Sequence, residues 1–199
     1  MDCSQRAPSG KNPSLLTPQK IAEIQARATC LYDEAQVEGA LDSMAEAIGA
    51  ELADKNPLVI CVMHGGLITA GKLATRLGFP LQMDYLHATR YRGATQGKDL
   101  QWKVLPSVSL QDRAVLLIDD IFDVGTTLKL IVEYCRQQGC ASVHSAVLLD
   151  KQHGRKESGI DVDFVGLKVA DRYLFGYGMD YKDYLRNAAG IYAIAEQDM

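Results

Sequence analysis

The sequence has no strong charge of one sign and no long hydrophobic run. Its 21 Lys and Arg against 25 Asp and Glu leave a net charge of −4 at pH 7. A chain with this balance has no overall positive field with which to collect nucleic acid or an anionic membrane surface. The longest apolar runs, such as residues 58–63, fall far short of the roughly 20 residues that span a bilayer, and the polar start has no apolar signal core. We therefore expect a cytoplasmic protein without nucleic-acid or membrane partners.

Cysteine and the common nucleotide-binding motifs are also scarce or missing. The chain has five cysteines, an odd number, and no Cys-x-x-Cys pair. Cys61 and Cys135 lie in apolar stretches, where reduced core cysteine is the usual interpretation, so we expect neither disulfides nor a zinc site. No G-x-G-x-x-G follows a strand, and no G-x-x-x-x-G-K-[ST] is present, which disfavours dinucleotide and P-loop folds.

What the sequence does contain is typical of one globular domain, since 47% of its 199 residues are hydrophobic and 23% charged. Residues 1–16 are rich in Ser, Pro, Asn and Gly and are expected to form a flexible tail, with a single domain over 17–199. Thr17 and Pro18 predict the start of a helix that ends near Arg27, followed by a short strand over 28–32. Asp33 caps a second predicted helix, which runs to about residue 53 and carries an apolar stripe.

From residue 58 the pattern alternates between strands and helices, which is typical of an α/β fold with a parallel sheet. The predicted strands cover 58–63, 81–89, 101–105, 115–118 and 143–149, and the predicted helices cover 67–77, closed by Gly78, and 126–138, stopped by Gly139. Residues 90–100 are polar, contain glycine and show no periodicity. They predict a mobile loop and a candidate lid with Arg90 and Tyr91 at its hinge end, although an idle surface loop would look the same.

The segment 115–128 carries most of the chemical information. An apolar strand runs into three carboxylates, Asp119, Asp120 and Asp123, and then into a Gly-Thr-Thr turn that opens a helix. The free N–H groups of a helix start, helped by hydroxyls and a permissive glycine, can hold one phosphate. The carboxylates would repel that phosphate unless they faced sugar hydroxyls or a divalent cation. The segment therefore predicts a phosphosugar site.

Two further loops are expected beside this one, because ligands bind at the carboxyl ends of parallel strands. The first is His64-Gly65-Gly66, where paired glycines allow an anion such as pyrophosphate to approach the backbone, or simply form a tight turn. The second covers residues 150–154 and contains Lys151, which has only donors to offer. It would pair with a carbonyl oxygen or a phosphate, unless it is merely an exposed lysine.

Here the sequence resembles a known family. The stretch LLIDDIFDVGTT at 116–127 matches the 5-phosphoribosyl pyrophosphate (PRPP) signature of the type I phosphoribosyltransferases. Together with residues 64–66, 148–151, 163–166, 171–181 and 184–186, it looks like a hypoxanthine-guanine phosphoribosyltransferase over about residues 58–194.

The resemblance implies an α/β fold of type I, with a central parallel sheet flanked by helices. The core would cover about 55–170, and a small hood would form from the terminal segments 17–54 and 171–199. It also implies purine salvage, in which a Mg²⁺-dependent homodimer or homotetramer transfers the phosphoribosyl group of PRPP to hypoxanthine or guanine, giving IMP or GMP and pyrophosphate.

Residue roles carry over from the resemblance position by position. Asp119 and Asp120 would hold the ribose hydroxyls directly or through Mg²⁺, with Asp180 as a further Mg²⁺ ligand, and Asp123 would be the general base for purine N7. The 5′-phosphate would lie against Asp123, Val124, Gly125, Thr126 and Thr127. Pyrophosphate would contact His64, Gly65, Gly66 and Arg186, and the purine Lys151, Arg172, Tyr173 and Leu174. The family often has a non-proline cis peptide before a residue like His64.

Two departures and several alternatives remain open from the sequence. Val124 stands where many relatives have Thr, and His64 where some have Lys. Adjacent side chains such as Asp119 and Asp120 would point to opposite faces if the strand continued through them. Tyr173 could be a core aromatic rather than a purine partner. A PRPP-sensing regulator and a phospho-acceptor receiver domain are the rival functions. The purine residues argue against the first, and the 118 residues before Asp119 against the second.

Overall fold

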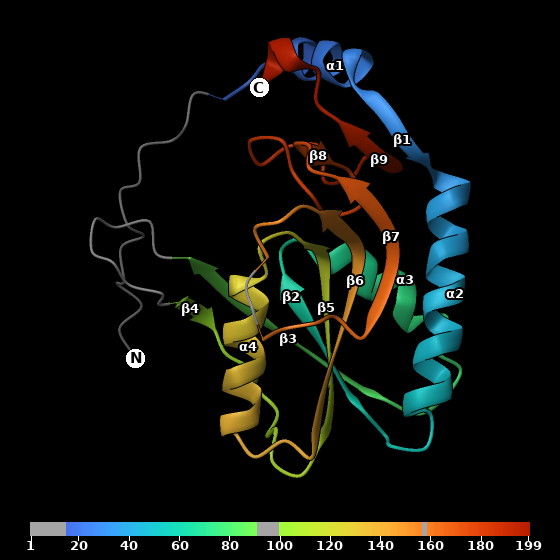
Figure 1. The fold of residues 1–199 in the computed structure, drawn as a ribbon, viewed down its shortest axis with the longest axis vertical. Helices are drawn as coiled ribbons and strands as arrows, with labels where there is room; N and C mark the ends of the chain where they lie inside the picture. Colours follow the sequence, from blue (N-terminus) through green and yellow to red (C-terminus); the bar gives the residue numbers. More distant parts are fainter. Residues whose placement is uncertain (1–14, 91–99, 157–158) are drawn as a thin grey trace, which may run out of the picture.

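The computed structural model describes residues 15–90, 100–156 and 159–199. Within them, six strands form the main sheet in the order β4-β3-β2-β5-β6-β7 (Figure 1). All neighbours in this sheet run parallel except β3 and β4, which are antiparallel. The bounds are β2 (Leu58–Met63), β3 (Gln82–Arg90), β4 (Leu100–Val104), β5 (Ala114–Phe122), β6 (Ser142–Gln152) and β7 (Phe164–Ala170). The predicted α/β fold with a largely parallel sheet is confirmed.

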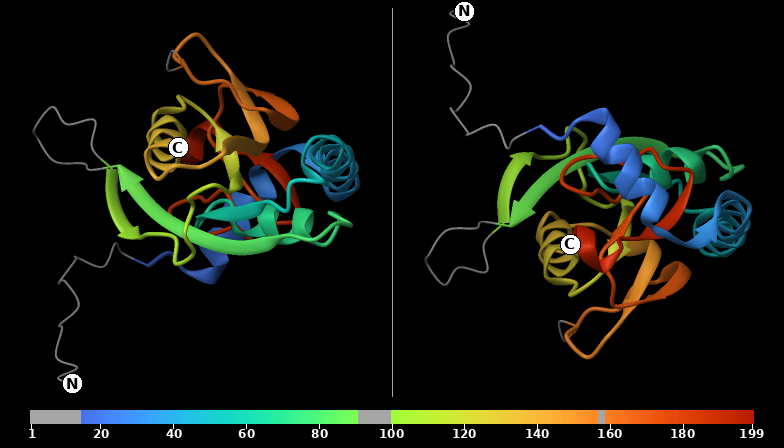
Figure 2. Two further views of the ribbon diagram at one scale, coloured as in Figure 1. Left: turned by 90° about the horizontal axis from the view of Figure 1, so that it is seen from below. Right: turned by 90° about the horizontal axis from the view of Figure 1, so that it is seen from above.

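Helices cover both faces of this sheet (Figure 2). On one face, α2 (Glu34–Leu52) and α3 (Leu67–Ala74) share a buried core with Val59 and Ile118. On the other, α4 (Thr126–Gln137) packs with Ile60 and Leu117. Since successive side chains of a strand point to opposite faces, covering both faces requires the unbroken apolar runs seen in β2 and β5.

A second, smaller sheet is antiparallel and has the strand order β1-β9-β8. It joins β1 (Thr29–Asp33) to β9 (Gly190–Ala193) and β8 (Leu174–Phe175), segments far apart in the sequence. We call this sheet, with α1 (Pro18–Arg27), the segment between β8 and β9 and the short helix η1 (Glu196–Asp198), the hood. Arg27 of α1 donates two hydrogen bonds, of 2.9 and 2.8 Å, to the carboxylate of Asp198. The hood lies beyond the carboxyl ends of the main strands (Figure 1).

The predicted helix caps are confirmed. The hydroxyl of Thr17 accepts the N–H of Lys20 at the start of α1. At α2, the Asp33 carboxylate accepts the Gln36 N–H at 2.9 Å while the Gln36 side chain accepts the Asp33 N–H, which forms a reciprocal capping box. The apolar stripe of α2, which the sequence analysis grouped with the hood, packs against β7 and the main sheet.

Several boundaries differ from the predictions for local reasons. Helix α3 ends at Ala74, and the predicted extension to Leu77 with closure at Gly78 is wrong. The Lys72 carbonyl accepts from the hydroxyl of Thr75 and the guanidinium of Arg76, while the Arg76 N–H bonds to the Leu73 carbonyl in a tighter turn. β5 continues to Phe122 and β6 to Gln152, beyond their predicted ends, and β7, β8 and β9 were not predicted.

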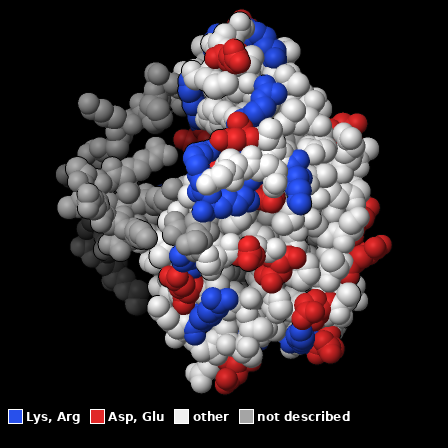
Figure 3. Space-filling model, in the orientation of Figure 1, with Lys and Arg blue, Asp and Glu red and all other residues white. Residues whose placement is uncertain are grey.

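The helices, cysteines and surface charges of the structure can be compared with the composition of the chain. Among the described residues, no helix has both the length and the hydropathy needed to cross a membrane. The four described cysteines are free, and burial raises the pKa of the Cys61 and Cys135 thiols to about 12. Charges of both signs are interspersed on the face shown in Figure 3, so neither sign dominates it.

Candidate active site

A cavity of about 310 Å³ lies at the carboxyl ends of β2 and β5; we call it the acidic cavity. Its wall is formed by the two strand ends, Gly65 of the loop after β2, Ala88 of β3, the turn from β5 into α4, and one side chain of the hood. Eight of the residues predicted to bind substrate line it: Gly65, Asp119, Asp120, Asp123, Val124, Gly125, Thr127 and Arg186. Two of the three loops predicted to converge on one edge of the sheet, 64–66 and 119–127, meet at this cavity, and the third reaches it only through the contact of Lys151 with Asp123.

Two adjacent carboxylates dominate the electrostatics of the acidic cavity. β5 continues through Asp119 and Asp120, yet both line the cavity, Asp119 half-buried and Asp120 only 8% exposed. Burial raises the pKa of both carboxyls, and the charge of Asp120 raises that of Asp119 further. The positive charge of Arg186 opposes the rise at Asp120. Such a pair can bind hydroxyl groups or a divalent cation, both of which would relieve its repulsion.

Glycines let three backbone segments meet beside Asp120. A Cβ at Gly65 would overlap the Asp120 carboxylate, and one at Gly66 would overlap the Ile118 carbonyl oxygen. Gly178 of the hood has φ +106°, and a Cβ there would overlap the carbonyl oxygen of Gly65. Side chains at these positions would force the loop, the strand and the hood apart. The Met63–His64 peptide bond that precedes this loop is cis, as the family resemblance implied.

The turn from β5 into α4 presents backbone donors to the same cavity. Gly125 has φ +89°, and the ring of Phe122 fills the space where a Cβ would lie. Gly125 has no side chain with which to cap α4, and within 15–90, 100–156 and 159–199 no side-chain cap bond is made there, so the amide groups of the first turn can bind an anion. Thr127 and Val124 line the cavity, whereas Thr126 does not belong to its wall.

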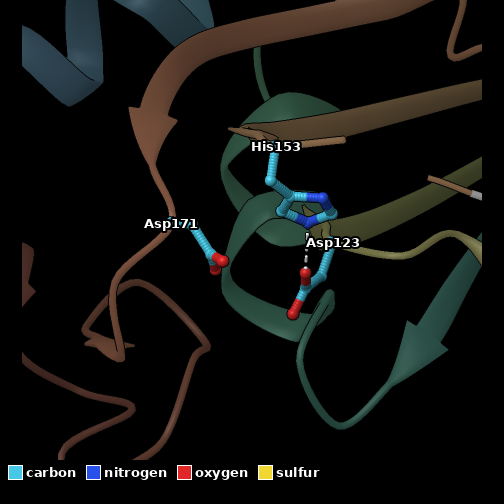
Figure 4. A group of neighbouring side chains, drawn as sticks. All are labelled: Asp123, His153 and Asp171. Carbon is cyan, nitrogen blue, oxygen red and sulfur yellow. Dashed lines mark hydrogen bonds and ion pairs between the residues drawn. The ribbon is translucent and has the colours of Figure 1, made fainter. Parts of the chain in front are cut away.

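On the other side of Asp123 lies a group of charged side chains that we call the Asp123 cluster: Asp123, Lys151, His153 and Asp171. They follow or end β5, β6 and β7 and point toward one another (Figure 4 shows Asp123, His153 and Asp171). His153 Nε2 lies 2.7 Å from Asp123 Oδ1, and Lys151 Nζ lies 3.3 Å from Asp123 Oδ2 and 3.5 Å from Asp171 Oδ1. Burial raises the pKa of Asp123, but the hydrogen bond to His153 and the charge of Lys151 outweigh it and hold this pKa below its ordinary value.

The cluster also brings together three potential metal ligands. The ligand atoms of Asp123, His153 and Asp171 lie within 4.8 Å of one another. However, Lys151 pairs with both carboxylates and Arg155 pairs with Asp171, so protein cations already balance the negative charge. We therefore assign no metal ion to it.

The hood and the segment 171–173 that leads into it from β7 supply further predicted residues. Arg186 donates to the Gly178 carbonyl at 2.6 Å and pairs with Asp180 at 2.6 Å, so Asp180 holds the arginine that reaches the acidic cavity. Tyr173 is 40% exposed, with its ring centroid 5.8 Å from that of Tyr181. Arg172 is half-buried and Leu174 is buried in β8. Asp171, two residues before Tyr173, connects this segment to Lys151.

Several predicted residues do not line the acidic cavity or lie outside the described residues. His64 is one of them: it is exposed, and its ring packs edge-on against that of His87 at 4.4 Å. Arg90 ends β3, but its side chain and Tyr91 lie outside the described residues. The lid over 90–100 therefore stays a prediction.

Sequence reasoning assigned no role to His153 or Asp171, although both contact the predicted site. The signal for His153 was available, because residues two apart on a strand share a face and His153 follows Lys151 at that spacing. It was missed because strand β6 was expected to end before Lys151. Asp171 could not be placed without β7, which was not predicted.

Comparison with known proteins gives consistent matches. Residues 28–183 match the family model described as phosphoribosyl transferase domain. The chain is 33% identical over 159 residues to a hypoxanthine-guanine phosphoribosyltransferase of Bacillus subtilis, covering 79% of this chain and 87% of that one. It is 29% identical over 157 residues to a hypoxanthine-guanine-xanthine phosphoribosyltransferase of Tritrichomonas foetus, covering 79% and 86%. A crystal structure of a hypoxanthine phosphoribosyltransferase from Staphylococcus aureus superimposes with a TM-score of 0.80 at 26% identity, over 85% of this chain and 92% of that one.

Proposed function

Since the chain belongs to the phosphoribosyl transferase domain family, we propose that it is a purine salvage enzyme that transfers the 5-phosphoribosyl group of PRPP to hypoxanthine or guanine. The products are IMP or GMP and pyrophosphate. The position of Asp123 carries the proposal beyond family membership. Its side chain lines the acidic cavity and at the same time contacts Lys151. A base held by Lys151 would thus lie next to a sugar phosphate held in the cavity.

The chain's own residues account for substrate binding on the phosphoribosyl side. The 5′-phosphate would accept hydrogen bonds from the open first turn of α4, and the Thr127 hydroxyl lies in the same wall. Pyrophosphate would lie between the Gly65 backbone and Arg186, which is held in place by Gly178 and Asp180. A guanidinium suits this task because its donors match phosphate oxygens in pairs.

The chemical step is a displacement at ribose C1. A bond forms between purine N9 and C1 as the C1–O bond to pyrophosphate breaks, and pyrophosphate leaves with the electron pair. The proton on purine N7 passes to the Asp123 carboxylate. With its pKa below the ordinary value, Asp123 is ionised near neutral pH, where it can accept that proton or stabilise the positive charge that develops on the purine.

We also propose that a magnesium ion binds in the acidic cavity. Asp119 and Asp120 offer the oxygen ligands that Mg²⁺ prefers, and the raised pKa of both carboxyls reflects a negative charge that a cation would balance. Bound there, the ion would neutralise the pyrophosphate leaving group. Asp180 fits less well as a ligand, because Arg186 and the Asp183 N–H already engage its two oxygens.

Lys151 is the proposed determinant for 6-oxopurines. Its side chain is 12% exposed and offers only donors, so it matches a 6-oxo group and leaves a 6-amino group unpaired. A substrate that leaves a buried polar group of the site unpaired is rejected by orders of magnitude relative to the matched substrate. Tyr173 offers an exposed aromatic face from the same segment as Asp171, which supports a stacking role.

We also propose a homodimer that works in the cytoplasm. Exposed apolar side chains gather on the outer strands of the main sheet, where Met83 and Tyr85 lie on β3 and Val104 on its neighbour β4. A second copy of the chain would bury this patch. Sedimentation should therefore give a dimer mass, and Tyr85→Glu should shift it toward the monomer.

Free cysteines agree with a reducing compartment.

The direct test is turnover. Purified protein with PRPP and Mg²⁺ is incubated separately with hypoxanthine, guanine, xanthine and adenine, and the nucleotide and pyrophosphate formed are measured together. We expect equimolar products with hypoxanthine or guanine. Absence of turnover with every purine, combined with tight PRPP binding, would instead favour a sensor. If adenine were the best substrate, the role given to Lys151 would be wrong.

A further inference from the structure

We infer that His153 is a positioning residue for Asp123, an inference that rests on the function proposed above. The His153 side chain is 6% exposed, and its Nε2 lies 2.7 Å from Asp123 Oδ1. It reaches this position from the end of β6, two residues beyond Lys151 on the same side of the chain. The two side chains therefore occupy the two oxygens of one carboxylate, His153 on Oδ1 and Lys151 on Oδ2.

The backbone fixes the direction of the histidine hydrogen bond. The N–H of Arg155 donates to His153 Nδ1 at 3.1 Å. A backbone N–H can only donate, so Nδ1 must act as an acceptor and carry no proton. The neutral ring then has its proton on Nε2, which makes His153 the donor to Asp123 Oδ1. This arrangement orients an acceptor-only carboxylate in one rotamer.

The charged groups around Asp123 explain why a separate side chain is needed to orient its carboxylate. Three charged groups compete around Asp123: Lys151 contacts it directly, Asp171 shares that lysine, and Arg155 pairs with Asp171. When a purine engages Lys151, the lysine contact with Asp123 Oδ2 weakens, and only His153 remains to hold the carboxylate. His153 does not line the acidic cavity, so it acts through Asp123 and not on the sugar phosphate.

The main variant is His153→Leu, which replaces the imidazole by an apolar side chain of similar bulk and so removes the donor. Loss of a hydrogen bond to the charged form raises the pKa of Asp123, so the acid limb of the kcat profile should move to higher pH. We expect kcat for hypoxanthine to fall roughly 10-fold at pH 7, since correctly held bases contribute about 100-fold or more. The KM for PRPP should change less than about 2-fold.

Two further variants separate positioning from packing. His153→Gln restores a donor at a similar reach and should recover most of the lost kcat. His144→Gln removes a histidine from the same strand, whose Nε2 has no hydrogen-bond partner among the described residues, and should leave kcat and the pH profile unchanged. Thermal melts of all variants show whether each one is folded.

A double-mutant cycle completes the test. Because His153 acts through Asp123, His153→Leu should have little further effect once Asp123→Asn has removed the base. Equal effects of His153→Leu in both backgrounds, or an unshifted acid limb, would overturn the inference. These outcomes are distinct from failure of the proposed function, which would appear as absent turnover by the unmodified protein in the same assay.

Discussion

The acidic cavity and the Asp123 cluster lie on two sides of one aspartate, but they are built in different ways. The cavity consists mainly of one contiguous stretch, 119–127, and of backbone segments that meet at glycines. The cluster consists of charged side chains from three separate strand ends. In the first, shape depends on the absence of side chains, whereas in the second, geometry depends on balanced charges. The two regions should therefore fail under different substitutions.

The largest effect is expected from Gly178→Ala, which disrupts the close backbone contact between the hood and the loop at Gly65. The new Cβ would overlap the Gly65 carbonyl oxygen at a φ of +106°, where L side chains are strained. We expect kcat/KM for PRPP to fall at least about 100-fold, and the free energy of unfolding to drop by roughly 2–4 kcal/mol. Steady-state kinetics and urea denaturation measure the two effects.

Gly71→Ala is the matched control for that substitution. Gly71 lies within α3, and a Cβ there would meet nothing within 4 Å. Alanine should raise the stability by about 0.5–1 kcal/mol and leave kinetics unchanged. A Gly178→Ala protein as active and as stable as this control would show that the close packing of hood and loop is not required.

The next effect concerns the charges of the cluster. Lys151→Gln keeps polarity but removes the charge that faces Asp123 and Asp171. We expect kcat/KM for hypoxanthine to fall about 100-fold, mostly through KM for the base, with a relative gain for adenine because an amide offers an acceptor. Binding of PRPP alone, followed by calorimetry, should change little.

Lys168→Gln is the control, since Lys168 has an exposed side chain on β7. It should behave as the unmodified protein. An equal loss of PRPP binding in Lys151→Gln would mean that the cavity and the cluster are not separable in the way described above.

A smaller effect is expected at the joint between the hood and α2. Glu38 accepts hydrogen bonds from Lys72, Tyr177 and Arg76, and these lower its pKa to about 2 against burial, which opposes the shift. Glu38→Gln should reduce the free energy of unfolding by about 1–2 kcal/mol at pH 7. Glu46→Gln, an exposed position on the same helix, is the control.

The pH dependence of that difference has a defined sign. A carboxyl whose pKa is lowered by folding stabilises the protein above its unfolded pKa, and the contribution is lost as pH falls through the folded value. The gap between the unmodified protein and Glu38→Gln should thus be constant above about pH 5 and close between about pH 4.5 and 2. A gap that widened on acidification would contradict the assignment.

The smallest effect is expected from Val124→Thr. Val124 lines the acidic cavity beside the open first turn of α4, and threonine has nearly the same shape with one added hydroxyl. If this hydroxyl contacts the 5′-phosphate, KM for PRPP should fall roughly 2- to 5-fold, consistent with about one net hydrogen bond. An increase in KM would place the phosphate elsewhere in the cavity.

The same contrast explains how much could be predicted from the sequence. The strand, carboxylates and turn of 115–128 form one local pattern, so a phosphosugar site could be predicted there without tertiary structure. The caps at Thr17 and Asp33 were equally local and are confirmed. Only Asp123 and Lys151 of the cluster could be predicted, because His153 and Asp171 are brought next to them by the parallel pairing of β5, β6 and β7.

Strands β8 and β9 of the hood could not be predicted from the sequence. β8 has two residues and β9 four, too few to show periodicity; β9 pairs with the distant β1, and β8 pairs with β9. The buried contact of Gly178 with Gly65 likewise joins positions more than a hundred residues apart. Long-range backbone contacts of this kind leave no signature in a single sequence.

The pairing of β1 with β9 also bears on how the protein is synthesised. Thr29 pairs with Ala193 and Asp33 with Gly190, so β1 has no partner until the chain has been translated as far as residue 193. Removing residues 190–193 would therefore leave the hood incomplete beyond the carboxyl ends of the main strands.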